Sequence, residues 1–355
     1  GGITNRIVRF ASCIVGWIRG GLGLTNIAAS MLFGGITGTA VADAASIGGV
    51  MIPGMKKAGY PADFSAAVTA ASSTVGPIIP PSVPMIIVGA LSGISVGQMF
   101  LAGAIPGILM GLAMMVTAYF ISIKRGYPSQ AWQGFGEVIN SFGHAFWALA
   151  MTFLIIYGLL SGVSTPTETA VVASLYAFVV GTFIYRELPL RALPKILIDS
   201  GVSASGILIL VGFANVFGWI LVSERIPQMI ASGVLSITDN KYMVILLINI
   251  LLLFVGMFME TIAALIILFV PLLSLATAVG IEPLHFATFA VLNLMIGLTT
   301  PPVGVCLFVC ANIAKISLSA VVKAILPFLL TNILILLAVS YIPEIATWLP
   351  SMLKP

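Results

Sequence analysis

Long apolar stretches separated by short polar segments make up most of this chain of 355 residues. About 20 apolar residues are enough for a helix to cross a bilayer. The pattern therefore predicts an all-α integral membrane protein. The uninterrupted spanning helices are expected at 98–123, 142–162, 168–185, 200–222 and 323–342.

Four other apolar stretches are interrupted near their middle, and each half is shorter than the about 20 residues that a spanning helix needs. Basic residues flank both ends of the first stretch, so the positive-inside rule places both of its ends on the cytoplasmic side. A segment that enters and leaves on one side is a re-entrant hairpin. We expect re-entrant helical hairpins at 24–53 and 242–272, and broken transmembrane helices at 62–94 and 284–314.

Prolines mark the interruptions of the two broken helices. A proline has no N–H to donate and clashes with the preceding turn, so it cannot continue a helix. Non-helical backbone at membrane depth persists only where it is buried in protein or lines a wet cavity. We expect the helix breaks at Pro77, Pro80 and Pro81 and at Pro301 and Pro302.

The two units of hairpin plus broken helix match at a constant offset, since adding 221 to Pro80-Pro81 gives Pro301-Pro302. Five predicted crossings separate the hairpins: the broken helix at 62–94 and the four uninterrupted helices between 98 and 222. Because five is odd, the second unit is upside down relative to the first. Inverted repeats with discontinuous helices are typical of secondary transporters. The alternative is an old duplication without a transport role. The other matches include Phe33 with Phe254, Gly35 with Gly256, Ala42 with Ala263, Gly59 with Gly280, Gly76 with Gly297 and Pro106 with Pro327.

Two shorter segments complete the predicted organisation. Arginines interrupt the apolar pattern of 5–20, which favours an amphipathic helix at the membrane surface. A second surface helix is expected at 227–237. The expected divisions are an interfacial arm helix at 1–23, the first hairpin and broken helix at 24–94, scaffold helices with a linker and second arm helix at 95–241, the second hairpin and broken helix at 242–314, and a C-terminal scaffold helix and tail at 315–355.

Composition agrees with a membrane protein, because 60% of the residues are hydrophobic and only 7% are charged. A soluble domain carries about 25% charged residues. The predicted topology places twelve basic residues on the cytoplasmic side and three, Arg225, Lys241 and Lys354, on the other. The basic residues form no stripe that would indicate nucleic-acid binding.

The cysteines and histidines do not indicate a metal centre. Cys13, Cys306 and Cys310 lie in apolar stretches without metal-ligand spacing, and we interpret them as small core residues. His144 and His285 lie near predicted membrane boundaries, and we expect both to be interfacial rather than proton relays.

Oxygen-rich interruptions that face one another are typical of a site for a hard cation. Unwound backbone leaves carbonyls free and hydroxyls add neutral oxygens, a ligand preference that we extend from calcium and magnesium to sodium. Helix N-termini at the same breaks also favour an anionic carboxylate. The candidate sodium ligands are Thr37, Gly38, Thr39, Ser72, Ser73, Thr74, Gly76 and Ser82 in the first unit, and Thr261, Thr299, Thr300 and Gly304 in the second.

For any single hydroxyl, the competing interpretation is a side chain bonded to its own helix backbone. Clustering at two repeat-related breaks favours an ion site for the group, although not for each member.

Charged residues supply further candidates. Asp43 and Glu260 lie at predicted membrane depth, where a carboxylate is costly and is a functional candidate. We favour Glu260 for substrate or ion coupling, against a structural pairing or a protonated acid, and expect Asp43 to cap or brace the first hairpin. Arg19 is either a membrane anchor or an anion contact. The candidate substrate-binding residues are Glu260, Thr39, Ser82 and Arg19.

The motifs around both hairpins resemble those of a known family, the large membrane subunits of TRAP (tripartite ATP-independent periplasmic) transporters. The first half carries GGLGLTNIAASMLFGGITGTAVADAASIGG followed by GYPADFSAAVTAASSTVGPIIPPSVP, and the second carries GMFMETIAALIILFVPLL and GLTTPPVGVCLFV. The resemblance covers nearly the whole chain. Two positions depart from the family pattern: Thr-Gly-Thr stands at 37–39 where Ser-Gly-Ser is frequent, and Glu260 stands where we expect Asp.

The resemblance implies sodium-driven uptake of an organic-acid anion, of the sialic acid or C4-dicarboxylate class, across a bacterial inner membrane. It implies a periplasmic substrate-binding protein and a small membrane subunit as partners, and further spanning helices before Gly1. It also implies an elevator-type fold, in which the hairpins and broken helices move together against a scaffold. Sodium ions would be the coupling ions, and no other cofactor is expected.

Three alternatives remain at this point. A sodium/anion symporter that needs no binding protein shares the inverted hairpins. An intramembrane enzyme needs an activated nucleophile or a metal, and the sequence contains no GxSG, GxGD or HExxH pattern. A structural subunit would not need polar tips. ATP-driven transport within this chain is disfavoured because it has no GxxxxGK[ST] loop.

Overall fold

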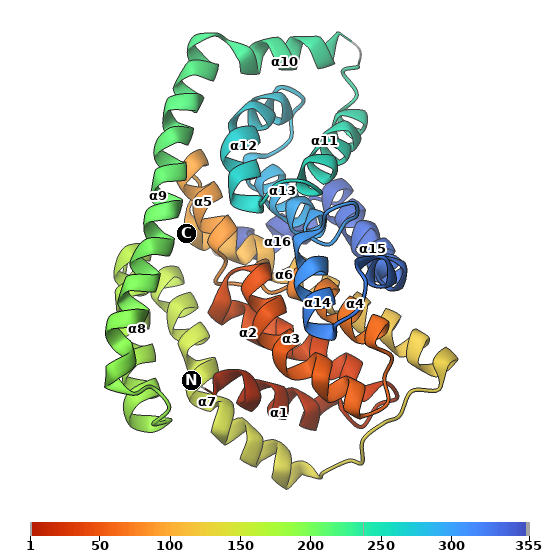
Figure 1. Ribbon diagram of the computed structural model, residues 1–355. Helices are drawn as coiled ribbons and strands as arrows, with labels where there is room; N and C mark the ends of the chain where they lie inside the picture. The colour runs from red at the N-terminus through yellow and green to blue at the C-terminus, as the bar shows by residue number, and fades with distance from the viewer. Residues whose placement is uncertain (1, 237, 353–355) are drawn as a thin grey trace.

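The computed structural model describes residues 2–236 and 238–352, and Lys354, assigned above to the outer side, lies outside these ranges (Figure 1). All regular secondary structure in the described ranges is helical. Six of the described helices are long and apolar enough to cross a membrane. The prediction of an all-α, multi-pass membrane protein is therefore confirmed.

The first unit consists of an arm helix, a helical hairpin and an interrupted helix. Glycine permits the turns between them, since Gly20 and Gly38 have φ of 73° and 64°, a conformation that costs glycine little because it has no Cβ. The arm is α1 (Ile3–Val15), the hairpin is α2 (Gly21–Thr37) with α3 (Ala40–Lys57), and the interrupted helix is α4 (Ala62–Ser73) with α5 (Val83–Ser92).

Long helices connect the first unit to the second. Thr165 and Glu168 form a capping box at the start of one of them, in which each side chain accepts the other's backbone N–H. The connecting elements are α6 (Val96–Arg125), α7 (Phe135–Leu160), α8 (Pro166–Val179) with a π-helical continuation η1 (Val180–Ile184), the 3₁₀ turn η2 (Leu190–Ala192), α9 (Leu193–Ser223) and the short α10 (Ile226–Leu235).

The second unit repeats the helix bounds of the first. Adding 221 to 40–57, the bounds of α3, gives 261–278, the bounds of α12, and adding 221 to 62, where α4 begins, gives 283, where α13 begins. The second unit comprises the hairpin α11 (Lys241–Gly256) with α12 (Thr261–Ala278) and the interrupted helix α13 (Pro283–Gly297) with α14 (Val305–Ala314). The helices α15 (Leu318–Tyr341), which corresponds to α6, and α16 (Glu344–Met352) follow it.

The two units pack on each other in a reciprocal way. The second half of each interrupted helix contacts the hairpin of the other unit: α5 packs on α12, and α14 packs on α3. The short helices α1 and α10 also correspond, because each contacts its own hairpin and one long connecting helix, α7 or α9 respectively. Figure 1 shows the two hairpins at opposite ends of the molecule with the interrupted helices between them.

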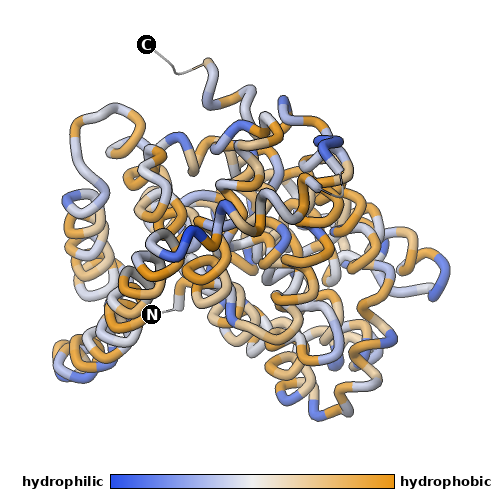
Figure 2. The backbone as a smooth tube through the Cα atoms, turned by 90° about the horizontal axis from the view of Figure 1, so that it is seen from above, coloured by the Kyte–Doolittle hydropathy of each residue, from blue (hydrophilic) through white to orange (hydrophobic). Residues whose placement is uncertain are grey.

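The periphery of the molecule is apolar, as expected for a surface in contact with lipid or another membrane subunit. Along α7 and α9, Phe153 is 71% exposed and Phe213 is 72% exposed. In Figure 2 most of the backbone is orange or white, and the hydrophilic stretches are short. Exposed apolar area on this scale is unsuited to water, which agrees with the composition.

The structure corrects three details of the predicted elements. The sequence places the interruption of the first hairpin at 34–39, but only 38–39 are non-helical, because α2 continues to Thr37. The spanning helix expected at 142–162 begins earlier, at Phe135, within a more polar stretch. The helix α16 was not predicted, and it packs against α6 and α13.

The two histidines differ in burial. His285 is buried within the protein, and its Nε2 lies 2.8 Å from the carbonyl oxygen of Val339 because α15 covers the start of α13. His144 is exposed. The interfacial depth of both residues stays a prediction. The three cysteines are buried and free, which confirms their interpretation as core residues.

Candidate functional site

The tip of each hairpin lies directly on the break of the following interrupted helix. A Cβ added to Gly76 would lie 2.8 Å from the Cα of Gly34, and one added to Gly297 would lie 2.6 Å from the Cα of Gly256. The two backbones therefore touch without an intervening side chain in both units. We call these contacts the first and second junctions. At the second, the N–H of Gly304 also donates to the carbonyl of Met257 at 3.5 Å.

The two hairpin tips are built differently. At the first tip, the N-cap Thr39 is extended and its side chain makes no capping bond, so the first N–H groups of α3 have no side-chain acceptor there. At the second tip, the N-cap is Glu260, whose Oε2 accepts from the N–H groups of Ile262 at 2.8 Å and Ala263 at 3.2 Å. The Glu260 carboxylate thus has a structural role at the start of α12.

Most candidate hydroxyls at the breaks bond to their own helices, as the competing interpretation of each single residue expected. Four of them donate to a carbonyl three or four residues earlier, at 2.8 or 2.9 Å: Ser73 and Thr74 in the first break, and Thr299 and Thr300 in the second. A hydroxyl has one proton to donate and two lone pairs. These donations therefore orient the oxygen lone pairs away from the backbone acceptor and leave them free to bind a cation.

Two tip hydroxyls differ from the others. The Oγ1 atoms of Thr37 and Thr261 are buried and have no hydrogen-bond partner among the described residues. Buried polar atoms are nearly always paired, and an unpaired one in a native structure indicates strain, an ion or a ligand. Thr37 and Thr261 flank the two tips, one at the end of α2 and the other at the start of α12.

Asp43 is the most unusual side chain of the site. It is fully buried in the first turns of α3, and neither carboxylate oxygen has a hydrogen-bond partner of ordinary geometry among the described residues, with the Ser30 side chain nearby. A Cβ on Gly76 would lie 3.7 Å from its Oδ2, so the carboxylate faces the first junction. The structure therefore does not support the expected capping role, because a capping carboxylate accepts N–H bonds.

An uncharged cluster of polar side chains joins hairpin to interrupted helix in each unit, and sequence reasoning missed both clusters. In the first, Asn26 on α2 donates to Thr69 at 2.6 Å and accepts from Ser72 at 3.3 Å. In the second, Asn293 on α13 donates to Asn249 Oδ1 on α11 at 2.8 Å. Adding 221 to 72 gives 293, so Asn293 in the second cluster stands at the repeat position of Ser72 in the first. Ser72, predicted as a sodium ligand, is thus engaged in a structural cluster.

The starts of two helices adjoin beside the first tip, and a third helix lies nearby. A Cβ on Gly38 would lie 2.8 Å from Val83, the first residue of α5, so the starts of α3 and α5 adjoin. Val83 in turn packs against a small cluster of Ile87, Ile262 and Ile266, which joins α5 to α12. Helix N-termini carry partial positive charge, so their combination favours an anion. The N-cap residue of α5 is Ser82, whose Oγ accepts from Met85 N–H at 3.3 Å.

Arg19 does not join the other candidate substrate residues. It is exposed in the turn before α2, at the end of that helix remote from Thr37. A helix of 17 residues is about 25 Å long. This placement agrees with the anchor interpretation and not with a direct contact between Arg19 and an anion at the tips.

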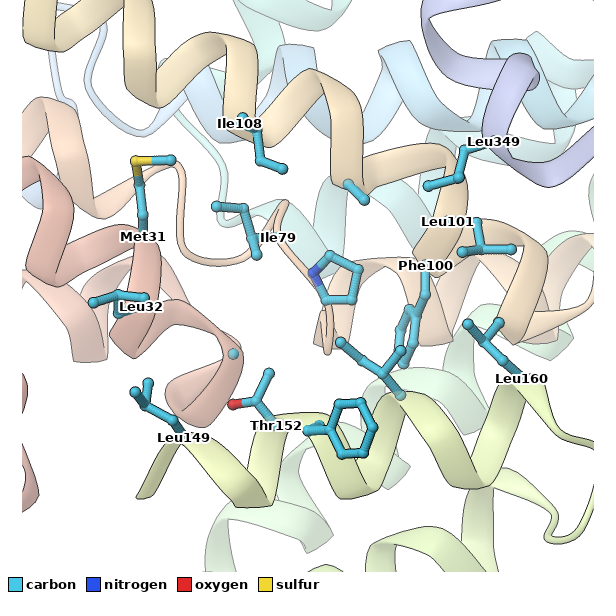
Figure 3. Close-up of a pocket in the computed structure, with 15 residues that line it drawn as sticks. Met31, Leu32, Ile79, Phe100, Leu101, Ile108, Leu149, Thr152, Leu160 and Leu349 are labelled. Carbon is cyan, nitrogen blue, oxygen red and sulfur yellow. The ribbon is translucent and has the colours of Figure 1, made fainter. Parts of the chain in front are cut away.

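The cavity next to the first junction is apolar. It has a volume of 470 Å³ and lies between α2, the first break, α6, α7 and α16 (Figure 3). Its one notable polar atom is the hydroxyl of Thr152, which Figure 3 shows on the side of α2 and which is buried without a hydrogen-bond partner in the described ranges. An anion in this cavity would be desolvated without compensation, so it is unsuited to a carboxylate substrate.

The junction geometry predicts that Gly297→Ala destabilises the protein by about 1–3 kcal/mol, because the added methyl overlaps the backbone of Gly256. Gly49→Ala is the matched control, since Gly49 is also helical and a Cβ there meets nothing within 4 Å. Thermal unfolding in detergent measures the melting temperature of each purified variant. Equal melting temperatures for the two variants would contradict the close contact.

Comparison with known proteins supports a transport role for this arrangement. The family described as "Tripartite ATP-independent periplasmic transporter, DctM component" matches residues 1–345. The sialic acid TRAP transporter large permease protein of Vibrio cholerae is 44% identical over 99% of this chain and 82% of its own length. The C4-dicarboxylate TRAP transporter large permease protein of Pseudomonas aeruginosa is 38% identical over 99% of this chain and 83% of its own length.

A third relative is longer. The sialic acid TRAP transporter permease protein of Haemophilus influenzae is 38% identical over 100% of this chain, which spans 58% of that protein. The family match and all three relatives extend over both junctions and the helices between them. The chain therefore belongs to the DctM component family of tripartite ATP-independent periplasmic transporters, and it is a multi-pass transport permease rather than an enzyme.

Proposed function

We propose that this protein takes up an organic-acid anion across a bacterial inner membrane, driven by sodium and supplied by a periplasmic substrate-binding protein. A small membrane subunit completes the transporter. The observation that carries the proposal is the pair of repeat-related junctions, each with a buried tip hydroxyl, Thr37 or Thr261, that has no partner among the described residues. The names of the relatives, which refer to sialic acid and C4-dicarboxylate, suggest a carboxylate substrate.

Sodium binds at both junctions in this proposal. The first site draws oxygens from Thr37, Gly38 and Thr39 at the tip and from the break at 74–82. The second draws them from Thr261 at the tip and from Thr299, Thr300 and the backbone near Gly304. The backbone turns at both breaks leave carbonyls outside the helical pattern, which suits a cation that prefers oxygen ligands.

Asp43 and Glu260 have different roles in the proposal. Asp43 is buried and faces the first junction, so a cation nearby compensates the cost of burying its charge. Glu260 uses one oxygen to cap α12, and its other oxygen contributes negative charge beside the second junction.

The substrate carboxylate binds where the starts of α3 and α5 adjoin, near α12. Thr39 and Ser82 offer hydroxyls there, and the uncapped N–H groups of α3 can donate to the anion. The apolar cavity beside the first junction takes no part in carboxylate binding. Arg19 acts as an anchor at the membrane surface.

The hairpins and interrupted helices move as one block in this proposal, which is an elevator motion. The reciprocal contacts of α5 with α12 and of α14 with α3 hold the block together. The helices α6 to α10 and α15 form the scaffold. The hairpins are re-entrant from opposite membrane faces, as the inverted repeat requires.

Removing one tip hydroxyl is expected to weaken sodium activation of uptake. Thr37→Val and Thr261→Val keep the side-chain shape, and each should raise the half-saturating sodium concentration roughly tenfold, since an interaction with a charge is lost. Sodium titration of uptake into proteoliposomes measures this. Thr277→Val is the control, because its hydroxyl bonds within α12 to Leu273. Unchanged sodium dependence in both tip variants would remove these hydroxyls from the sites.

Replacing Glu260 by Gln separates its cap from its charge, because the amide oxygen can still accept from the N–H groups of Ile262 and Ala263. We expect near-normal thermal stability and at least a tenfold loss of uptake, as for a charge that interacts with an ion. The exposed Asp199→Asn is the matched control. Full uptake by Glu260→Gln would restrict this residue to its capping role.

The inverted arrangement predicts that the end of α3 and the start of α13 lie on opposite membrane faces. Single cysteines at Lys57 and Glu282, both exposed, are labelled with a membrane-impermeant maleimide in sealed vesicles of known orientation. The native cysteines are buried, so the unmodified chain gives the background. Labelling of both positions from the same side would refute the inverted topology.

A further inference from the structure

A basic cavity lies far from both junctions, between the end of α6 and the first half of α15. Its volume is 390 Å³, and its lining comprises Phe64, Ile121, Lys124, Arg125, Lys323, Ala324 and Pro327. We call it the basic cavity. Three of these seven residues are cationic and none is acidic, in a chain with only 7% charged residues.

Antiparallel packing brings these cations together. The helices α6 and α15 contact each other, and Thr117 and Thr331 share a hydrogen bond of 2.7 Å between their hydroxyls. From that contact, Lys124 is seven residues further along α6 and Lys323 is eight residues back along α15. Since the two helices run in opposite directions, both lysines lie at the same end of the pair.

The charges of the basic cavity are not neutralised by ion pairs. Both ion pairs recorded among the described residues involve α1, namely Arg6 with Glu187 and Arg9 with Glu137. Arg125 donates to Tyr127 Oη at 3.2 Å, and Asp63 is near enough to act electrostatically on Arg125. Asp63 also accepts a hydrogen bond from the N–H of Phe64 at 2.8 Å. One acid beside three cations leaves an excess of positive charge at the cavity.

The cavity has a position and a lining that suit a lipid headgroup at the membrane boundary. Both α6 and α15 are long and apolar enough to cross a membrane, and the cavity lies at an end of each. The end of α6 reaches the edge of the molecule (Figure 1). Phe64, Ile121 and Pro327 provide an apolar wall beside the cationic groups. Basic pockets between transmembrane helices on the cytoplasmic side bind anionic headgroups.

We propose that the basic cavity is a binding site for a phosphate group, held by Lys124, Arg125 and Lys323. The phosphate is that of an anionic lipid headgroup or inorganic phosphate from solution, and both present the same oxygens to the three cations. The site is separate from the sodium and substrate sites proposed above, and it does not depend on them.

Native mass spectrometry of the intact transporter in detergent tests the site. The protein is titrated with phosphatidylglycerol, and with phosphatidylcholine of the same acyl chains as the neutral comparison. We expect preferential binding of phosphatidylglycerol, and a roughly tenfold weaker affinity for it in Lys124→Gln/Lys323→Gln. Lys124→Arg/Lys323→Arg should retain binding and so separates lost charge from lost folding. The control pair Arg191→Gln/Lys195→Gln removes two exposed charges elsewhere and should bind as the native protein does.

A second arm of the experiment adds inorganic phosphate. Displacement of phosphatidylglycerol by millimolar phosphate, with the same dependence on Lys124 and Lys323, supports the site and identifies its source as the solution. Retention of the lipid supports the site and identifies the source as the membrane. Equal binding of the two lipids without phosphate binding, or equal losses in the control and the cavity variants, would overturn the proposal.

Discussion

Non-helical backbone inside a membrane protein must be protected by the protein itself, and the rest of this structure depends on how that requirement is met. At each junction a hairpin tip lies on a helix break with glycine against glycine, Gly34 on Gly76 and Gly256 on Gly297. The contact excludes side chains, so the end part of each hairpin's first helix packs directly against the backbone at the break. In the proposed function, a sodium ion at each junction takes oxygen ligands from both elements.

The reciprocal packing of the two units makes the junctions parts of one structure. Because α5 contacts α12 and α14 contacts α3, neither hairpin can move far without the other. In the proposed function, this packing couples an anion near the starts of α3 and α5 to sodium ions at the junctions. Uncharged clusters around Asn26 and Asn249 hold each hairpin to its interrupted helix without adding charge to the interior.

Much of this arrangement is predictable from the sequence, because glycine and proline impose strong local constraints on the backbone. The breaks, the repeat offset and the multi-pass helical fold follow from Pro80-Pro81, Pro301-Pro302 and the apolar stretches between them. The direction of side chains is not predictable in the same way. Glu260 caps α12, which we did not expect, and Asp43 makes no capping bond, because each outcome depends on which N–H groups the tertiary structure leaves open. The coupling role of Glu260 stays a prediction. The helix α16 was missed for a similar reason, since its packing against α6 and α13 involves distant parts of the chain.

Uptake into proteoliposomes tests the central claim most directly. The full-length protein is reconstituted with its small membrane subunit, and labelled sialic acid or a C4-dicarboxylate is supplied under an inward sodium gradient, with and without the periplasmic binding protein. We expect uptake only when both the sodium gradient and the binding protein are present. Uptake that persists without the binding protein would indicate a stand-alone symporter, and uptake that is independent of sodium would contradict the proposed role of the two junctions.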